Sequence, residues 1–367
     1  MTSPEITGNP PGSFAWGVLH ERHPKLIAQV RDGLPYPPAT GRALDELADE
    51  ITGVIRPLPG WPEYAGRSWD DVPFLWAESC FYRKLLDAVG YFAPGPWQGV
   101  DPFEPVKSAE LRGPELADDL AAFAEHTDDS TDDSTVDSAL LTASLWGNRA
   151  DLGFRLSSGQ ADGAGALLVD ESPLLWSLLD GGPVVIVADN SARELVPDLL
   201  LADRLLATGR ASAVVLHVKP YPYYVSDALL SDVVAALRRL ADSPVADAGH
   251  RLVAAMRDGR LDVRAHPFSC APWSYHRMPD DLAADFASAT VTIMKGDLNY
   301  RRLVGDRRWP PTTPFAEVTA YFPGRVAALR TMKCDVAVGI PADVVARLDA
   351  SGERWRSNGA HAVIHVR

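Results

Sequence analysis

One stretch in the middle of the chain decides the fold: Pro183-Val-Val-Ile-Val-Ala-Asp-Asn-Ser-Ala-Arg-Glu194. Its first half is a short run of β-branched residues, which is typical of a strand with both faces buried. Its second half is polar and leads into a helical pattern of apolar residues at Leu195, Leu199, Ala202 and Leu206. A buried strand followed directly by a helix is the repeating unit of a parallel sheet.

The same alternation continues on both sides of this unit. Five further runs have the character of strands: Ala166–Val169, Ala213–Val218, Leu261–Ala265, Thr290–Met294 and Val336–Val338. Because helical patterns fall between several of these runs, we expect an α/β fold with a mainly parallel sheet covered by helices on both faces. We assign this Rossmann-like three-layer α/β/α domain to residues 141–367. Such sheets bind their ligands beyond the carboxyl ends of the strands, so the candidate site residues are sought there.

The first part of the chain has a different pattern, and we expect residues 1–140 to form a helical N-terminal region. Helical spacing is clear at residues 74–89, and proline-rich segments interrupt the pattern at residues 35–38 and 57–62. The acidic tandem repeat Asp128–Thr135 contains no apolar residue, which predicts a solvated loop.

Composition narrows the class of protein. The chain has 367 residues with 35 Lys and Arg against 49 Asp and Glu, a formal net charge of −14. This balance disfavours nucleic-acid binding and docking on an anionic membrane, because both depend on clustered positive charge. No apolar run approaches the roughly 20 residues of a membrane span. Three separated cysteines (Cys80, Cys270 and Cys334) and an N-terminus without an apolar stretch predict a cytoplasmic protein, while the oligomeric state stays open.

The first group of candidate site residues follows the central strand. Asp189 and Asn190 stand where that strand ends, and burying an acid there is costly unless it is paired or bound to a metal. An alternative applies to their neighbours, because Ser191 and Glu194 have the spacing of a helix capping box. The spacing leaves a metal site, a phosphate site and a purely structural role open for this turn.

A second candidate follows the next strand along the chain. Asp227 ends the segment after that strand, and it could equally be the N-cap of a helix over residues 228–240. If the two strands are parallel neighbours, Asp227 lies at the same sheet edge as Asp189 and Asn190. Such an all-oxygen cluster suits Mg²⁺ or Mn²⁺ and lacks the Cys and His expected of a zinc site.

A third candidate is Lys295-Gly-Asp-Leu-Asn299, again at the end of an expected strand. Glycine allows close approach of the backbone to a ligand, and lysine acts as a point charge for phosphate. The same residues are also common in ordinary turns. Arg330 and Lys333 precede the last expected strand, whereas the basic run Arg301–Arg308 is interpreted as a solvated rim.

Seven groups of residues stand in a characteristic order along the chain. The landmarks are Ser13-Phe-Ala15 with Arg22, Glu78–Arg83, Ser144–Asp151, Asp189-Asn190 with Glu194, Tyr224–Asp227, Lys295–Arg301 with Gly305-Asp-Arg307, and Arg330-Thr-Met-Lys333. Over nearly the whole chain they resemble the metal-dependent damage-control phosphatases, formerly domain-of-unknown-function family 89. The Arg-Thr-x-Lys element is characteristic of the branch that includes acidic-residue methyltransferase 1.

The resemblance implies a helical N-terminal region on an α/β domain, and it implies roles for individual residues. A divalent metal (Mn²⁺, Co²⁺, Ni²⁺ or Mg²⁺) would be held by Asp189, Asn190 and Asp227. Substrate contacts would come from the following residues: Lys295, Gly296, Asp297, Leu298, Asn299, Lys333, Asn148, Asp151, Glu194 and Arg22. One departure stands out, because the family usually has glycine and a hydrophobic residue where this chain has Ala192 and Arg193. The added methyl group would restrict the backbone, and the arginine would add a charge beside the pocket.

The leading hypothesis is a divalent-metal-dependent phosphatase acting on a small phosphorylated metabolite, such as a sugar phosphate (for example a fructose phosphate). Asp189, Asp297 and Lys333 are the residues expected to act in catalysis. Two alternatives belong to other classes: a carboxyl methyltransferase that uses S-adenosylmethionine, and a non-catalytic protein that binds metal and a phosphorylated metabolite. No glycine-rich adenosylmethionine loop follows an early strand, so the sequence itself adds nothing to the methyltransferase alternative.

Overall fold

The computed structural model describes residues 3–126, 132–147 and 166–367. Its centre is a seven-stranded sheet in the order β1-β7-β6-β5-β2-β3-β4. The strands are β1 (Ala166–Asp170), β2 (Val184–Val187), β3 (Val214–Val218), β4 (Leu261–Ala265), β5 (Val291–Lys295), β6 (Val326–Thr331) and β7 (His361–Val366). All neighbouring strands are parallel except the antiparallel pair β6 and β7. The expected mainly parallel α/β sheet is therefore confirmed.

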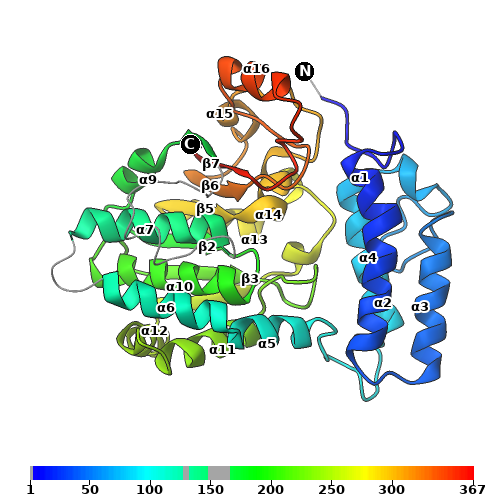
Figure 1. Ribbon diagram of the computed structural model, residues 1–367, viewed down its shortest axis with the longest axis horizontal. Coiled ribbons are helices and arrows are strands. Elements are labelled where there is room, and N and C mark those ends of the chain that lie inside the picture. Colours follow the sequence, from blue (N-terminus) through cyan, green and yellow to red (C-terminus); the bar gives the residue numbers. More distant parts are fainter. Residues whose placement is uncertain (1–2, 127–131, 148–165) are drawn as a thin grey trace.

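Helices cover both faces of this sheet (Figure 1). One face packs on α6 (Pro114–His126), α7 (Asp133–Trp146), α9 (Ser172–Leu178), α10 (Ala192–Ala207), α11 (Leu230–Ala241) and α12 (Ala246–Asp258), with α5 (Glu104–Arg112) at their edge. The other face shares its core with α1 (Phe14–Gly17), α2 (His23–Gly33), α3 (Pro38–Glu50), α4 (Phe74–Ala88), α13 (Asp280–Ala287), α14 (Gly296–Val304), α15 (Phe315–Val318) and α16 (Ala342–Ala350).

Strand β2 shows why the sheet is sandwiched in this way. Val184 and Ile186 belong to the core on the α10 side, whereas Val185 and Val187 belong to the core on the opposite side. All four are at most 2 % exposed. A continuous apolar strand has no solvent-facing side, so both faces must be covered by helices.

One expected strand is wrong, and two strands were not anticipated. Val336–Val338 is a buried loop, and the carbonyl of Val336 accepts a hydrogen bond from Arg330 Nη1 (2.6 Å). The last two strands are β6 and β7, so Arg330 lies inside a strand rather than before one. A buried apolar run has the same sequence pattern whether or not it pairs with a strand, so the pattern predicts a strand at Val336–Val338. Strands β6 and β7 contain polar residues, which the apolar pattern of a buried strand does not predict.

Helices α1–α4 stand beside the sandwich, on the right of Figure 1. The division expected at residue 140 falls inside α7, which packs on α10. Within the repeat Asp128–Thr135, residues 128–131 lie outside the described residues, and Asp133–Thr135 is the first turn of α7 instead of a loop. In the part of the chain that the structure describes, no helix is both long and apolar enough to cross a membrane.

Candidate active site

The candidate site lies where the direction of the strand order changes. Strand β2 has β3 on one side and β5 on the other, although β3 and β4 intervene between β2 and β5 in the sequence. Loops at such a point diverge to opposite faces of the sheet and leave a crevice at the carboxyl edge. Asp189 follows β2 and Gly296 follows β5, so the third candidate motif meets the first at this crevice.

A cavity of about 240 Å³ occupies this edge. Eight residues predicted from the sequence line it: Arg22, Asp189, Asn190, Glu194, Asp227, Asp297, Leu298 and Lys333. Lys295, Gly296 and Asn299 do not line it. Asn148 and Asp151 lie outside the described residues. Most of the predicted residues are thus brought together from segments spread between residues 22 and 333 of the sequence.

The carboxylates after β2 and β3 are buried, and Lys107 Nζ donates to the backbone carbonyl of Asp227 (3.4 Å) rather than to its carboxylate. Asp189 is 8 % exposed and Asp227 is 2 % exposed, and neither forms an ion pair with any described residue. Burial, reinforced by the carboxylates of Glu194 and Asp227, raises the pKa of Asp189 well above its usual range. Burial also raises the pKa of Asp227, although the charge of Lys219 opposes that shift.

Asn190 connects these acids. Its backbone forms an isolated antiparallel β-bridge with that of Asp227. Its side-chain Nδ2 donates to Glu194 Oε2 (3.0 Å) and, at a longer distance, to Asp189 Oδ2 (3.4 Å). The capping alternatives are wrong at this edge. The Ser191 side chain makes no capping bond, and the helix after Asp227 begins at Leu230, with Asp232 accepting from the Leu229 N–H.

The acids on the β5 side are neutralised by arginines. Asp297 accepts from Arg330 Nε (2.8 Å), and Glu78 on α4 accepts from Arg301 Nη1 (2.8 Å). Arg301 also donates to both carboxylate oxygens of Asp306, at 2.8 and 3.1 Å. Although burial opposes ionisation, the charges of Arg330 and Arg301 hold the pKa of Asp297 below its usual value. The interpretation of Arg301 and its neighbour as a solvated rim is wrong, since both are at most 3 % exposed.

The three predicted cations have different surroundings. The side chain of Lys333 is 45 % exposed at the cavity, with its Nζ 3.7 Å from Glu194 Oε1. Arg330 is fully buried and stacks on Tyr300 at 4.3 Å. Lys295 is turned away from the cavity into the core, where its Nζ lies 3.0 Å from Asp198 and donates to the Ser144 carbonyl.

Gly296 and Asn299 support the site from behind. Gly296 has a φ of +80°, and a Cβ atom there would lie 1.8 Å from Asp189 Oδ2. Only glycine combines that conformation with that close approach. Asn299 is fully buried, and its Nδ2 donates to the carbonyls of Ala188 (3.1 Å) and Lys295 (2.8 Å). It thereby ties the end of β2 to the end of β5.

The departure at residues 192 and 193 is resolved by the structure. Ala192 has a φ of +51°, a left-handed conformation that favours glycine. Arg193 does not line the cavity, because its Nη2 pairs with Asp119 of α6 at 2.7 Å, although its charge opposes the rise in the pKa of Glu110 in the cavity wall.

Sequence reasoning did not assign a site role to several lining residues. Glu78, Tyr224 and Arg301 were quoted only as landmarks, and Glu110 carried no signal because it stands in an ordinary helical pattern. Tyr224 donates its hydroxyl to Glu78 Oε2 (3.0 Å), which adds α4 to the wall of the cavity. The one sequence feature that could have identified Glu78 and Arg301 is that the landmark motifs contain acidic residues and arginines close together.

The acidic side of the cavity fits a divalent cation in its donor chemistry. Carboxylate and amide oxygens are the ligands that Mg²⁺ and Mn²⁺ accept. The Asn190 amide nitrogen is engaged by carboxylates, and the buried Ser191 Oγ has no hydrogen-bond partner among the described residues. No group of three or more His, Cys, Asp or Glu in the described segments has the geometry of a metal site. The set suggested by the sequence contains only two acids and an amide.

An open, mainly parallel sheet with a ligand cavity at its switch point defines a class of α/β proteins that bind small molecules at the carboxyl edge. Within that class, the family model for the damage-control phosphatase ARMT1-like domain matches residues 18–348. The chain therefore belongs to the damage-control phosphatase ARMT1-like family. The resemblance inferred from the sequence motifs is confirmed.

Individual relatives agree with this assignment. The chain is similar to damage-control phosphatase ARMT1 of Rattus norvegicus, with 31 % identity covering 80 % of this chain and 74 % of the relative. The corresponding Danio rerio protein is 28 % identical over 96 % of this chain and 94 % of its own. A crystal structure of a DUF89 family protein from Pyrococcus horikoshii shares the fold, with a TM-score of 0.55, 14 % identity and coverage of 95 % and 96 % of the two chains.

Proposed function

We propose that this protein is a divalent-metal-dependent phosphatase that hydrolyses a small phosphorylated metabolite, namely a sugar phosphate such as a fructose phosphate. Family membership supports the reaction, since the curated relatives carry the name damage-control phosphatase. The observation that carries the metal dependence is the pair of buried acids, Asp189 and Asp227, whose carboxylates form no ion pair with any described residue. Burial of such charge is costly unless a cation accompanies it.

Asp189, Asn190 and Asp227 would hold the metal, which when bound supplies a positive charge that stabilises a phosphoryl group and acidifies water. The Asn190 side chain would contribute its amide oxygen, because its nitrogen already donates to Glu194. Gly296 leaves the space that Asp189 occupies. This part of the site requires no movement of the strands, because β2 and β5 are already tied through Asn299.

Lys333 would bind the outer oxygens of the phosphoryl group from across the cavity. Its half-exposed ammonium lies at the cavity edge, 3.7 Å from Glu194, and a phosphate could draw it from that weak pair. Asp297 would orient a sugar hydroxyl or the attacking water, since Arg330 keeps it ionised and capable of accepting hydrogen bonds. Positioning of this kind accounts for much of phosphoryl-transfer catalysis.

A metal-by-substrate screen on the purified chain tests the proposal. We expect phosphate release from at least one sugar phosphate, loss of that activity with EDTA, and its return with Mn²⁺, Co²⁺, Ni²⁺ or Mg²⁺. Turnover that fully resists the chelator would contradict the metal dependence.

The same screen separates the alternatives. Phosphate release without S-adenosylmethionine favours the phosphatase. Calorimetric binding of S-adenosylmethionine with no phosphate release on a broad panel favours a methyltransferase. Thermal stabilisation by sugar phosphate and metal together, without release over hours, would indicate a binding protein.

A further inference from the structure

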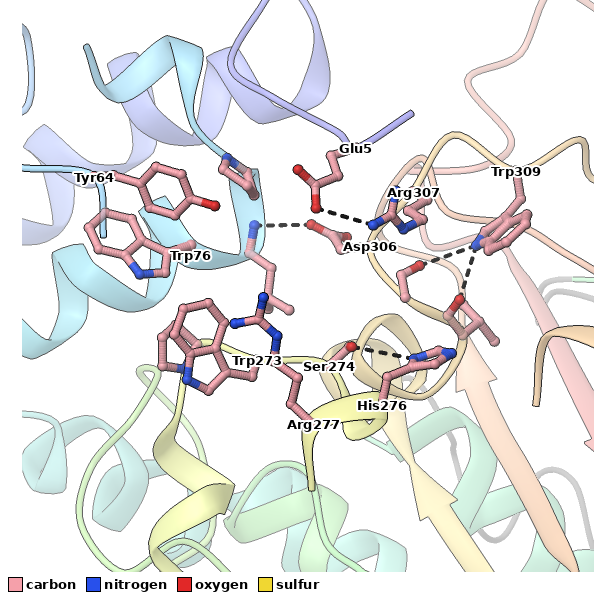
Figure 2. A pocket seen from close by; sticks show the side chains of 15 residues that line it. Glu5, Tyr64, Trp76, Trp273, Ser274, His276, Arg277, Asp306, Arg307 and Trp309 are labelled. Atoms are coloured by element: carbon pink, nitrogen blue, oxygen red, sulfur yellow. Dashed lines mark hydrogen bonds and ion pairs between the residues drawn. The ribbon is translucent and has the colours of Figure 1, made fainter. Parts of the chain in front are cut away.

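A second cavity lies between the N-terminal helical layer and two loops of the α/β part (Figure 2). Its walls come from residues 64–76, from the loop around Trp273 and from the residues that follow α14. The cavity has a volume of about 390 Å³ and shares no lining residue with the candidate active site. This volume is within the range of about 300–1,000 Å³ that small-molecule sites occupy.

Aromatic rings form much of the wall. Tyr64, Trp76, Trp273 and Trp309 all line the cavity. Tyr64 and Trp76 meet edge to face with ring centres 4.9 Å apart, and Trp309 is held by a hydrogen bond from its Nε1 to the Val304 carbonyl (3.0 Å). Rings fixed in this way offer flat apolar surfaces to a ligand at little cost in conformational entropy. The walls therefore favour a planar, ring-containing ligand.

The Tyr64 hydroxyl is the donor that a ligand can reach, and Figure 2 shows it directed towards the other lining side chains. Trp76 is 1 % exposed, and its Nε1 is buried away from the cavity, so this residue contributes only its ring. Burial, with the charge of Glu5, raises the pKa of the Tyr64 hydroxyl, which therefore stays protonated and able to donate. The ligand should carry acceptor atoms.

The charged groups of the wall leave Arg277 for a ligand. The wall holds two carboxylates, Glu5 and Asp306, and two guanidiniums, Arg277 and Arg307, so its formal charge is zero. Glu5 pairs with Arg307 (3.3 Å), and Asp306 accepts two bonds from Arg301, which lies outside the wall and also donates to Glu78. Arg277 is exposed, stacks on Trp273 at 4.3 Å and forms no ion pair with any described residue. One guanidinium thus remains to meet an anionic group at the rim, beside an aromatic wall. Figure 2 shows Arg277 next to the Trp273 ring.

From these observations we propose that the cavity binds a small planar aromatic anion, a flat ring that bears a carboxylate or phosphate. The ring lies among the indoles and Tyr64, an acceptor faces the Tyr64 hydroxyl, and its anionic group meets Arg277. This site is independent of the candidate active site, because the two cavities are lined by different residues.

Calorimetric titration of the full chain with four probes tests the proposal. The anions are 2-naphthoate and adenosine 5′-monophosphate, and their neutral counterparts are 2-naphthamide and adenosine. We expect saturable binding of at least one anion, about tenfold weaker binding of its neutral counterpart, and about tenfold loss of anion affinity in Arg277→Gln. Naphthoate binding alone would identify a carboxylate ligand, and monophosphate binding alone a phosphate ligand.

Three further variants locate the bound probe. Tyr64→Phe, which removes only a hydroxyl, should weaken binding a few-fold, whereas Arg238→Gln on the exposed side of α11 should leave it unchanged. Asp189→Ala in the candidate active site should also leave it unchanged. Absence of saturable binding by either anion, equal effects of Arg277→Gln and Arg238→Gln, or loss of binding in Asp189→Ala would each overturn the proposal.

Discussion

The two sides of the candidate active site carry acids in opposite electrostatic states. On the β2 and β3 side, Asp189 and Asp227 are buried with raised pKa values, and their carboxylates form no ion pair with a described residue. On the β5 side, Asp297 is matched by the buried Arg330, and its pKa is lowered. A buried acid that is ion-paired with an arginine has its charge compensated within the folded structure. A buried acid without such a partner is left with its burial uncompensated, and this asymmetry is the basis of the proposed metal site.

The ion pair between Arg330 and Asp297 should contribute strongly to the stability of the fold. Arg330→Met should lower the free energy of unfolding by about 3–5 kcal/mol, because Asp297 would remain buried without its partner. Chemical denaturation measures this change. Arg347→Met, an exposed position on α16, serves as the matched control and should change stability by no more than about 0.5 kcal/mol. A small effect of Arg330→Met would remove the distinction between the two sides.

The unpaired side should behave in the opposite way. Asp189→Ala should lower kcat/KM at limiting metal by about 10²–10³-fold, because a charged ligand is lost, while Asn190→Ala weakens metal binding less. Without added metal, the melting temperature of Asp189→Ala should not fall, since a buried charge near two other carboxylates is removed. Asp118→Ala, an exposed acid on α6, should change neither quantity. Near-normal turnover of Asp189→Ala would refute the ligand assignment.

Lys333 lines the same cavity as Asp189 and Asp227, and its contribution should be to turnover. Lys333→Met should reduce kcat/KM about 10²-fold, whereas its half-exposed pair with Glu194 predicts a stability change below about 1 kcal/mol. Steady-state kinetics and thermal melting together separate these effects, with Lys25→Met on α2 as the exposed control. A lowered melting temperature with full activity of the folded protein would show instead that Lys333 is structural.

The smallest expected effect concerns the backbone that carries the unpaired acids. Ala192→Gly should stabilise the protein by up to about 1 kcal/mol, because glycine adopts a φ of +51° without steric cost. Ala235→Gly, inside α11, should have the opposite sign, since glycine destabilises a regular helix by about 1 kcal/mol. Denaturant midpoints measure both changes. A destabilised Ala192→Gly would show that the left-handed conformation is not strained.

The position of the site could be predicted from the sequence because parallel strands bring their carboxyl ends to one edge. Asp189, Asn190 and Asp227 each follow a buried apolar run, and the structure places all three at one cavity. The pairing of charges could not be predicted. The sequence predicted Arg301 to be a solvated rim residue, yet it is buried between Glu78 and Asp306. Glu78 lies more than two hundred residues before Arg301 in the sequence, whereas Asp306 lies five residues after it.

Sequence alone determined the α/β class, the segment that forms the central strand, and the acids and amide that follow it. These features depend on local periodicity and on the rule that strand ends share an edge. Only the tertiary structure decided that Lys295 turns into the core and that Lys333 reaches the cavity. It also decided which buried acids form an ion pair with an arginine. A side chain's charge is written in the sequence, but its neutralisation depends on distances between distant segments, which local patterns do not contain.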